Sequence, residues 1–287
     1  MLLYKSNVVI VYQPDDIVLT DYRRNTLAKY QCTNEQQKEF IHELEKIGGL
    51  YTTRDLFFDW VRYTALGISL GGLDSQKEEH IEELNNIIKK YKESELKQFN
   101  SLAEIVAKHL KNNTDQDYLG DIYVELGLSN GNRGQIFTPY HISKLMAKLI
   151  YSPDAGGKGY TTASDPCIGS GTLMIAYANC AAENGLSMQD DLLIVGQDID
   201  RTLAMVSYIQ LSIIGVAGYV LVGDSLLSPD CGTDLFPPYD KEAFITPAFC
   251  TGIWELRRMI WLIHIQASNS DETEQRKQKA VYEPKNN

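Results

Sequence analysis

The chain has 287 residues, of which 44% are hydrophobic and 23% charged, the balance of a globular protein with one large domain or two small ones. It contains no run of about 18 apolar residues, so we expect no membrane span. The net charge of −11 argues against a chain that binds nucleic acid unaided, because phosphate contacts need a basic surface. A local basic patch or a partner subunit would have to supply such contacts.

The five cysteines are scattered along the chain and form no C-x-x-C pair. This pattern argues against a disulfide framework and against a zinc site, and we expect no bound metal. The first residues lack the small-residue cleavage site of a signal peptide. Together these features indicate a protein of the reducing cytoplasm.

Residues 1–130 are predicted to form a helical N-terminal region, because apolar residues recur there at intervals of three and four. Gly48-Gly49 is a signal for the end of the first helix, and Thr53 is a candidate cap for the second. The third helix is expected to bury Ile81 and Ile88 and to expose a lysine-rich face, for which a nucleic-acid role is the less favoured alternative. Four of the expected helices cover Asn34–Ile47, Ser75–Lys97, Leu102–Leu110 and Tyr118–Leu126, and the one that starts near Thr53 carries Leu56, Phe57, Trp60 and Val61 on one face.

Strands and helices then alternate over residues 131–267, which predicts an α/β domain with a parallel, doubly wound sheet. The polar tail at 268–287 is predicted to be disordered. The first helix of this domain is expected to carry an apolar stripe of Ile142, Leu145, Met146, Leu149 and Ile150. The elements after it are an extended segment Tyr160–Ser164, a helix Thr172–Ala182, a strand Leu192–Gly196, a helix Thr202–Ile214 and a strand Tyr219–Val222.

A glycine motif, Asp165-Pro-Cys-Ile-Gly169-Ser-Gly171-Thr172, links the first extended segment to a helix. Glycines allow a tight turn and close approach of a ligand to the backbone. The helix start offers free N–H groups to an anion such as a carboxylate, and Asp165 could meet a cationic group. A G-x-G pair by itself is about as often a structural turn, so the motif needs support from its surroundings.

That support comes from acidic residues at the ends of the next two strands. Asp198 follows the strand Leu192–Gly196, where a carboxylate is placed to bind ribose hydroxyls. Asp200 is better explained as the N-cap of the following helix. Asp224 ends the next strand and could accept a hydrogen bond from an adenine amine, although a strand-ending Gly-Asp is often only a turn.

With these motifs the stretch from Tyr118 to Asp224 resembles the methylase subunit of type I restriction–modification systems and related DNA adenine-N6 methyltransferases. Gly134-Gln-Ile-Phe-Thr-Pro139 resembles the family element G-Q-F-F-T-P, and the glycine motif resembles D-P-A-C-G-S-G. Gln197-Asp-Ile-Asp200 resembles E-I-D, and Gly223-Asp-Ser-Leu226 resembles G-D-T-L. The resemblance implies a Rossmann-like S-adenosylmethionine-dependent methyltransferase fold that acts on duplex DNA with a flipped adenine. It also implies a specificity subunit or a second copy of the chain as partner, and cofactor contacts from Phe137, Thr138, Pro139, Asp165, Cys167, Gly169, Gly171, Asp198 and Asp224.

The family's catalytic motif, N-P-P-F or N-P-P-Y, is missing from this sequence. Phe236-Pro-Pro-Tyr239 lacks the Asn and follows no apolar strand. Thr246-Pro247-Ala248-Phe249 is the better candidate, because a short strand Ala243–Ile245 precedes it. In the family the Asn and a proline carbonyl accept both N–H bonds of the adenine amine, and the aromatic ring stacks on the base. With Thr246 in place of Asn, the rate is expected to fall by ~10²–10³, as when one preorganised acceptor is lost.

Two other functions remain open at this level. The missing Asn, the short chain and the acidic charge favour a methylase-like module that binds DNA or a protein without catalysis. A nucleotide-binding oxidoreductase is less favoured, because the third glycine of G-x-G-x-x-G is absent. A last helix carries Trp254 and Trp261, which are expected to pack on the chain's own sheet, or otherwise to anchor a partner that completes it.

Overall fold

The computed structural model describes residues 3–5, 8–13, 16–18, 35–49, 51–71, 77–129, 137–152, 159–229, 235–238 and 240–264. The tail predicted at 268–287, the segment Gly134–Ile136 and the expected domain boundary at residue 130 lie outside these ranges. Within them, no helix has both the length and the apolar character needed to span a membrane.

Three short strands precede the helices: β1 (Leu3–Lys5), β2 (Val8–Gln13) and β3 (Asp16–Val18) form an antiparallel sheet in the order β1-β2-β3. The prediction that residues 1–130 are helical throughout is therefore wrong for this segment. The physical reason is the run Val-Val-Ile-Val-Tyr in β2, because β-branched and aromatic residues favour strands.

Five helices follow and confirm the helical character of residues 35–125: α1 (Glu35–Ile47), α2 (Thr53–Ser69), α3 (Lys77–Lys90), α4 (Glu93–Asn112) and α5 (Tyr118–Glu125). The cap of α2 is Thr52, one residue before the predicted one: its Oγ1 accepts a hydrogen bond from Asp55 N at 3.1 Å. The predicted single helix Ser75–Lys97 is two helices, because the backbone turns at Lys92, whose N–H donates to Glu95 Oε2 at 2.7 Å.

The buried face of α3 also differs from the expected one. Ile81 and Ile88 are 40% and 39% exposed, whereas His80 and Ile87 are buried. The buried side of α3 thus lies one residue earlier than predicted. The reason is that the His80 ring packs on Phe244 of the sheet, with ring centroids 5.4 Å apart. Lys90, in the predicted lysine-rich face, is bound to Asp59 of α2, which gives it a structural role.

The second half of the chain is the predicted α/β domain. Its elements are α6 (Tyr140–Ile150), β4 (Thr161–Asp165), α7 (Thr172–Glu183), β5 (Leu192–Asp198), α8 (Arg201–Ile214), β6 (Ala217–Val222), β7 (Ala243–Ile245) and the 3-10 turn η3 (Pro247–Cys250), followed by a helix over 252–264. The sheet order is β4-β5-β6-β7. β4, β5 and β6 are parallel, and β7 runs antiparallel to β6. This is a Rossmann-like α/β arrangement.

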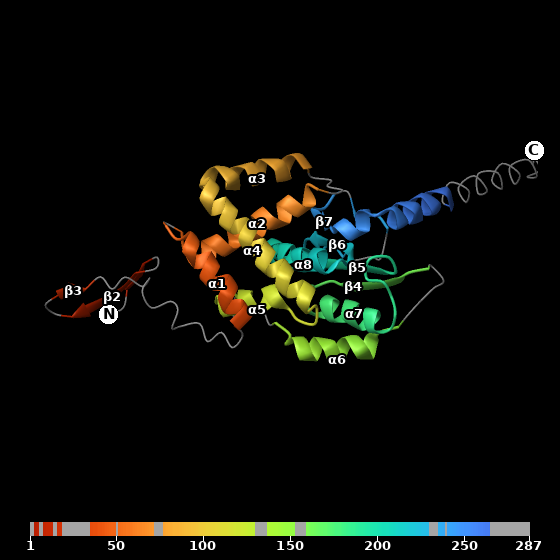
Figure 1. The fold of residues 1–287 in the computed structure, drawn as a ribbon, viewed down its shortest axis with the longest axis horizontal. Coiled ribbons are helices and arrows are strands. Elements are labelled where there is room, and N and C mark those ends of the chain that lie inside the picture. The colour runs from red at the N-terminus through yellow and green to blue at the C-terminus, as the bar shows by residue number, and fades with distance from the viewer. Residues whose placement is uncertain are drawn as a thin grey trace, which may run out of the picture.

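Two hydrophobic clusters cover the two faces of the sheet. Ile194 and Val220 belong to the larger cluster, which includes α7, α8 and the N-terminal helices. Leu193 and Tyr219 point to the other face, where they pack with Phe249 and Trp254. Figure 1 shows α8 between the N-terminal helices α2 and α4 and the sheet. Successive residues of a strand face opposite sides of the sheet. Because both sides are covered, β5 is buried from Leu192 to Gln197.

Helix α6 lies along α7 at the outside of the helical layer (Figure 1). Its apolar stripe is largely exposed: Ile142, Met146 and Leu149 are 40%, 41% and 76% exposed. The small residues Ser143 and Ala147 face α7 instead, because they let the two helices approach closely. Trp254 is fully buried against the chain's own sheet, as predicted, whereas Trp261 is 43% exposed and contacts Phe236.

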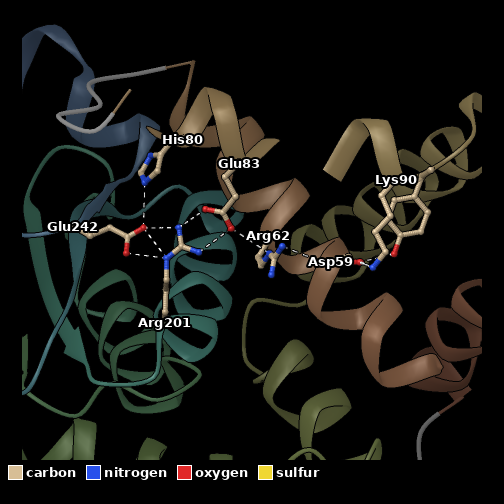
Figure 2. Close-up of polar contacts among 8 residues, drawn as sticks. Asp59, Arg62, His80, Glu83, Lys90, Arg201 and Glu242 are labelled. Atoms are coloured by element: carbon tan, nitrogen blue, oxygen red, sulfur yellow. Dashed lines mark hydrogen bonds and ion pairs between the residues drawn. The ribbon is translucent and has the colours of Figure 1, made fainter. Parts of the chain in front are cut away.

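Figure 2 shows how the N-terminal helices are fastened to the α/β domain. Arg201, the first residue of α8, donates to both carboxylate oxygens of Glu242 at 2.8 Å and to Glu83 of α3 at 3.0 and 2.7 Å. His80 lies 3.1 Å from Glu242 Oε1. Burial raises the pKa of Glu242, but the hydrogen bonds from His80 and Arg201 outweigh it and hold that pKa below its usual range. The start of α8 is thereby fixed against α3.

Candidate functional site

A cavity of about 290 Å³ opens at the carboxyl ends of β4 and β5, close to the lower end of the range for small-molecule sites. Its lining includes the predicted residues Phe137, Thr138, Asp165, Cys167, Gly169 and Asp198. The remaining lining residues, which were not predicted as a site, are Ser143, Met146, Ile168, Ser170, Thr172, Leu173, Ile199 and Leu203. Ser170, Thr172 and Ile199 lie inside the motifs that identified their neighbours. An interpretation that took every residue of those motifs as a candidate would have included them.

The glycine motif forms the floor of this cavity. Gly169 and Gly171 have φ angles of +58° and +95°, a region that favours glycine. Ile168 N donates to Gln197 O at 2.9 Å, and Gly169 N donates to Asp198 Oδ2 at 2.8 Å, so β5 holds the turn in place. α7 begins directly after Gly171, which leaves the free N–H groups of its first turn beside the cavity.

Two carboxylates face each other across this turn. Asp165 Oδ1 accepts a hydrogen bond from Cys167 N at 2.9 Å, and its other oxygen has no partner among the described residues. Burial raises the pKa of Asp165, and burial also raises that of Asp198 despite the N–H groups that Asp198 accepts from Gly169 and Asp200. Two half-buried carboxylates with no ion pair to a cation among the described residues fit a ligand that brings a positive charge and hydroxyl donors.

The acidic residues beyond Asp198 have local roles. Asp200 is the N-cap of α8, as predicted: its Oδ1 accepts from Thr202 N at 2.9 Å. Asp224 is absent from the cavity lining, and its Oδ1 accepts from Leu226 N at 2.8 Å, which is the turn interpretation. That turn does reach the glycine motif, because Ser225 Oγ lies 3.8 Å from Cys167 Sγ.

Two further predicted residues border the cavity without lining it. Pro139 is the exposed N-cap residue of α6, next to Thr138. Gly171 lies behind the turn against α8, where an added Cβ would come within 3.1 Å of Ser207 Cβ. Both therefore shape the wall of the site from outside. Among the described residues, no group of three His, Cys, Asp or Glu side chains is placed to hold a metal ion.

The segment Thr246-Pro247-Ala248-Phe249 is not part of this cavity, which corrects the prediction of a catalytic loop there. Thr246 is fully buried, and its Oγ1 accepts from Gly218 N at 2.9 Å and donates to Gly218 O at 3.1 Å. Phe249 is 1% exposed and packs on Tyr219 and Trp254. Pro247 is the first residue of the turn η3, which follows Thr246 and contains Phe249.

The direction of β7 explains this placement. Because β7 is antiparallel, its carboxyl end lies beside Gly218, near the start of β6, whereas the cavity lies at the ends of the parallel strands. Gly218 and Val222 are separated by about 13 Å at ~3.3 Å per residue, and two strands also intervene between β7 and β4. A ligand in the cavity cannot reach Thr246.

Replacing Thr246 by valine is expected to lower the free energy of unfolding by about 1–3 kcal/mol, because it leaves the buried Gly218 N–H without an acceptor. Thr246→Asn should be at least as destabilising, since the larger amide has no free space, and should not increase any methyl transfer. Denaturant unfolding checks the first point, with the half-buried Thr251→Val as the matched control. A gain of methyl transfer in Thr246→Asn would restore the catalytic-loop hypothesis.

The comparisons with known proteins point to one class. Residues 114–246, which contain the cavity-bearing strands, match the family N-6 DNA Methylase. The chain is similar to the type I restriction enzyme MjaVIII methylase subunit of Methanocaldococcus jannaschii (31% identity over 120 residues, 39% of this chain and 19% of the relative). It is also similar to the type II restriction enzyme and methyltransferase RM.BcgI of Heyndrickxia coagulans (40% identity over 81 residues, 27% of this chain and 12% of the relative).

The chain thus spans less than a fifth of the length of either curated relative. A crystal structure described as a class I S-adenosylmethionine-dependent methyltransferase, from Listeria monocytogenes, overlaps 67% of this chain and 55% of its own, with 18% identity and a TM-score of 0.37. At that TM-score we draw nothing from the overlap. The sheet topology is that of a Rossmann-like α/β core, and the family that this part of the chain matches is one of DNA methylases.

Proposed function

We propose that the cavity at the ends of β4 and β5 binds S-adenosylmethionine and that the chain takes part in methylation of adenine N6 in DNA. The observation that carries this proposal is the juxtaposition of the glycine turn, the start of α7 and the two half-buried carboxylates of Asp165 and Asp198 in one cavity. Such a site offers N–H groups to a carboxylate and negative charge to an ammonium group, both of which the cofactor's methionine part carries.

The residues present fit this cofactor. An added Cβ at Gly169 would meet nothing within 4 Å, so open space adjoins the turn where a ligand would lie. Asp165 offers the amino group a carboxylate oxygen that has no partner within the described part of the chain. Asp198 would receive the ribose hydroxyls, and the apolar side chains of Ile168, Ile199 and Leu203 line the same cavity and suit a purine ring.

Bound S-adenosylmethionine would supply a methyl group on a positively charged sulfur, which an amine can attack. The adenine amine is accessible only when the base is flipped out of the duplex. Because Thr246 and Phe249 are buried away from the cavity, acceptors for that amine must come from other groups at the cavity mouth or from a partner. The charge of −11 also favours a partner, a specificity subunit or a second copy of the chain, that holds the DNA. The cell compartment that we propose is the cytoplasm.

The test is methyl transfer from radiolabelled S-adenosylmethionine to unmodified DNA of mixed sequence, with and without a restriction–modification specificity subunit. Mass spectrometry of the digested DNA should find N6-methyladenine, and more of it when the subunit is present. The same protein with Asp165→Asn is the matched control, because Asn retains the acceptor for Cys167 N and removes the negative charge. Cofactor binding without transfer under every condition would favour the non-catalytic, methylase-like module instead.

A further inference from the structure

Asp117 is a buried carboxylate next to the cavity that no sequence motif identified. It is 4% exposed and is the N-cap of α5, where its Oδ1 accepts from Gly120 N at 3.0 Å. A side chain at position 120 would collide with it, because an added Cβ there would come within 2.2 Å of Asp117 Oδ2. Asp117 does not line the cavity itself.

The other oxygen of Asp117 reaches the glycine motif. Oδ2 accepts hydrogen bonds from Ser170 Oγ and from Thr172 Oγ1, two residues of the cavity lining that flank Gly171. These contacts join residues 53 and 55 positions apart in the chain. One carboxylate therefore caps α5 and holds both sides of the turn.

Gln210 of α8 closes the cluster from the opposite side. Its Nε2 donates to Asp117 Oδ1 at 2.7 Å and to Ser170 O at 2.9 Å, and its Oε1 accepts from Leu119 N at 3.0 Å. Gln210 is fully buried. The turn Ser170–Thr172 is thus fixed between α5 and α8 by side chains that lie outside the cavity.

We propose that Asp117 is a positioning residue for the cofactor turn: through Ser170 and Thr172 it keeps Gly169–Gly171 and the start of α7 in the geometry that receives the ligand. This inference rests on the proposed function for the identity of the ligand. Burying a carboxylate is costly, and an apolar side chain could fill the same volume. The four donors that converge on Asp117 offset that cost. Their hydrogen bonds also fix the groups that carry them, and two of these groups line the cavity.

Two variants separate positioning from mere packing. In Asp117→Ala all four donors lose their hydrogen bond to the carboxylate, and only Gln210 Nε2 keeps a second acceptor, Ser170 O. In Asp117→Asn the amide oxygen can still accept from Gly120 and Gln210, while its N–H groups can donate to the hydroxyl oxygens of Ser170 and Thr172. Tyr118→Phe is the matched control, because it removes a hydrogen bond of the same helix, from Tyr118 Oη to Gln36 O at 2.8 Å, that points away from the turn.

Calorimetry with S-adenosylhomocysteine should show an affinity about tenfold lower or worse in Asp117→Ala, equivalent to about 1.4 kcal/mol, because buried donors that hold the turn lose their acceptor. Asp117→Asn should recover most of that loss, and Tyr118→Phe should bind as the wild type does. If Asp117→Ala does not fold, Gln210→Met removes the second arm of the cluster and should act in the same direction. Equal affinity in Asp117→Ala and Tyr118→Phe would overturn the proposal.

The hydrogen-exchange rates of the backbone amides at residues 168–174, measured on the ligand-free proteins, test the positioning role without reference to ligand binding. These amides should exchange faster in Asp117→Ala than in Tyr118→Phe, and near the wild-type rate in Asp117→Asn. Wild-type protein that binds no S-adenosylhomocysteine would contradict the proposed function, whereas the exchange rates would still decide whether Asp117 positions the turn. Unchanged exchange at 168–174 in Asp117→Ala would overturn the positioning role.

Discussion

Replacing Gly169 by valine is expected to abolish measurable binding of S-adenosylmethionine, with an affinity at least ~100-fold below that of the wild type, equivalent to about 2.7 kcal/mol or more. Gly169 lines the cavity, and the space beside its Cα is empty of protein atoms. A valine side chain would fill the volume that the ligand needs. Calorimetry measures the affinity, and thermal unfolding shows whether the core remains folded.

The control for Gly169→Val must carry the same backbone strain elsewhere. Gly185, after the end of α7, has a φ of +89° and also has nothing within 4 Å of an added Cβ, but it lies outside the cavity lining. Both variants should lose stability by about 1–2 kcal/mol, the cost of a left-handed residue with a Cβ. Only Gly169→Val should lose the cofactor. Equal binding by the wild type and Gly169→Val would move the site away from the turn.

Replacing Asp198 by alanine is the second change expected to have a large effect. It removes the acceptor for Gly169 N and, in the proposed function, the partner of the ribose hydroxyls. Hydrogen bonds to a charged group contribute about 1.5–3 kcal/mol, so the affinity should fall by roughly 10- to 150-fold. Titration calorimetry of the variant with S-adenosylmethionine measures this directly.

Asp200→Ala is the matched control for Asp198→Ala. Asp200 caps α8, so its loss should lower the free energy of unfolding by about 1 kcal/mol. It should leave the affinity near that of the wild type, because Asp200 is absent from the cavity lining. If Asp200→Ala weakens cofactor binding and Asp198→Ala does not, the assignment of the ribose to Asp198 is wrong.

The parallel strands and the glycine turn could be predicted because their signals are local. A short extended segment followed by glycines and a helix start is readable within a dozen residues, and the N-cap role of Asp200 follows from its own position before α8. Such features depend on backbone conformation and on neighbours close in sequence. For the same reason α1 and α5 lie close to their predicted bounds, and α2 begins near its predicted start at Thr53.

Several wrong or missing predictions concern contacts between distant segments. The sequence predicts that Ala243–Ile245 is a strand, but not that it pairs antiparallel with β6 and buries Thr246 against Gly218. Periodicity identifies the apolar stripe of α6, but not that α7 receives the opposite, small-residue side. The role of Asp117 depends on Ser170 and Thr172, more than 50 positions away, and its only sequence signal is that of a helix cap.

Titration of the wild-type protein with S-adenosylmethionine tests most directly the central claim that the cavity at the ends of β4 and β5 is a cofactor site. We expect saturable binding at one site per chain, lost in Gly169→Val and retained in Gly185→Val. Absence of binding to the folded wild type, or binding that Gly169→Val leaves unchanged, would contradict it.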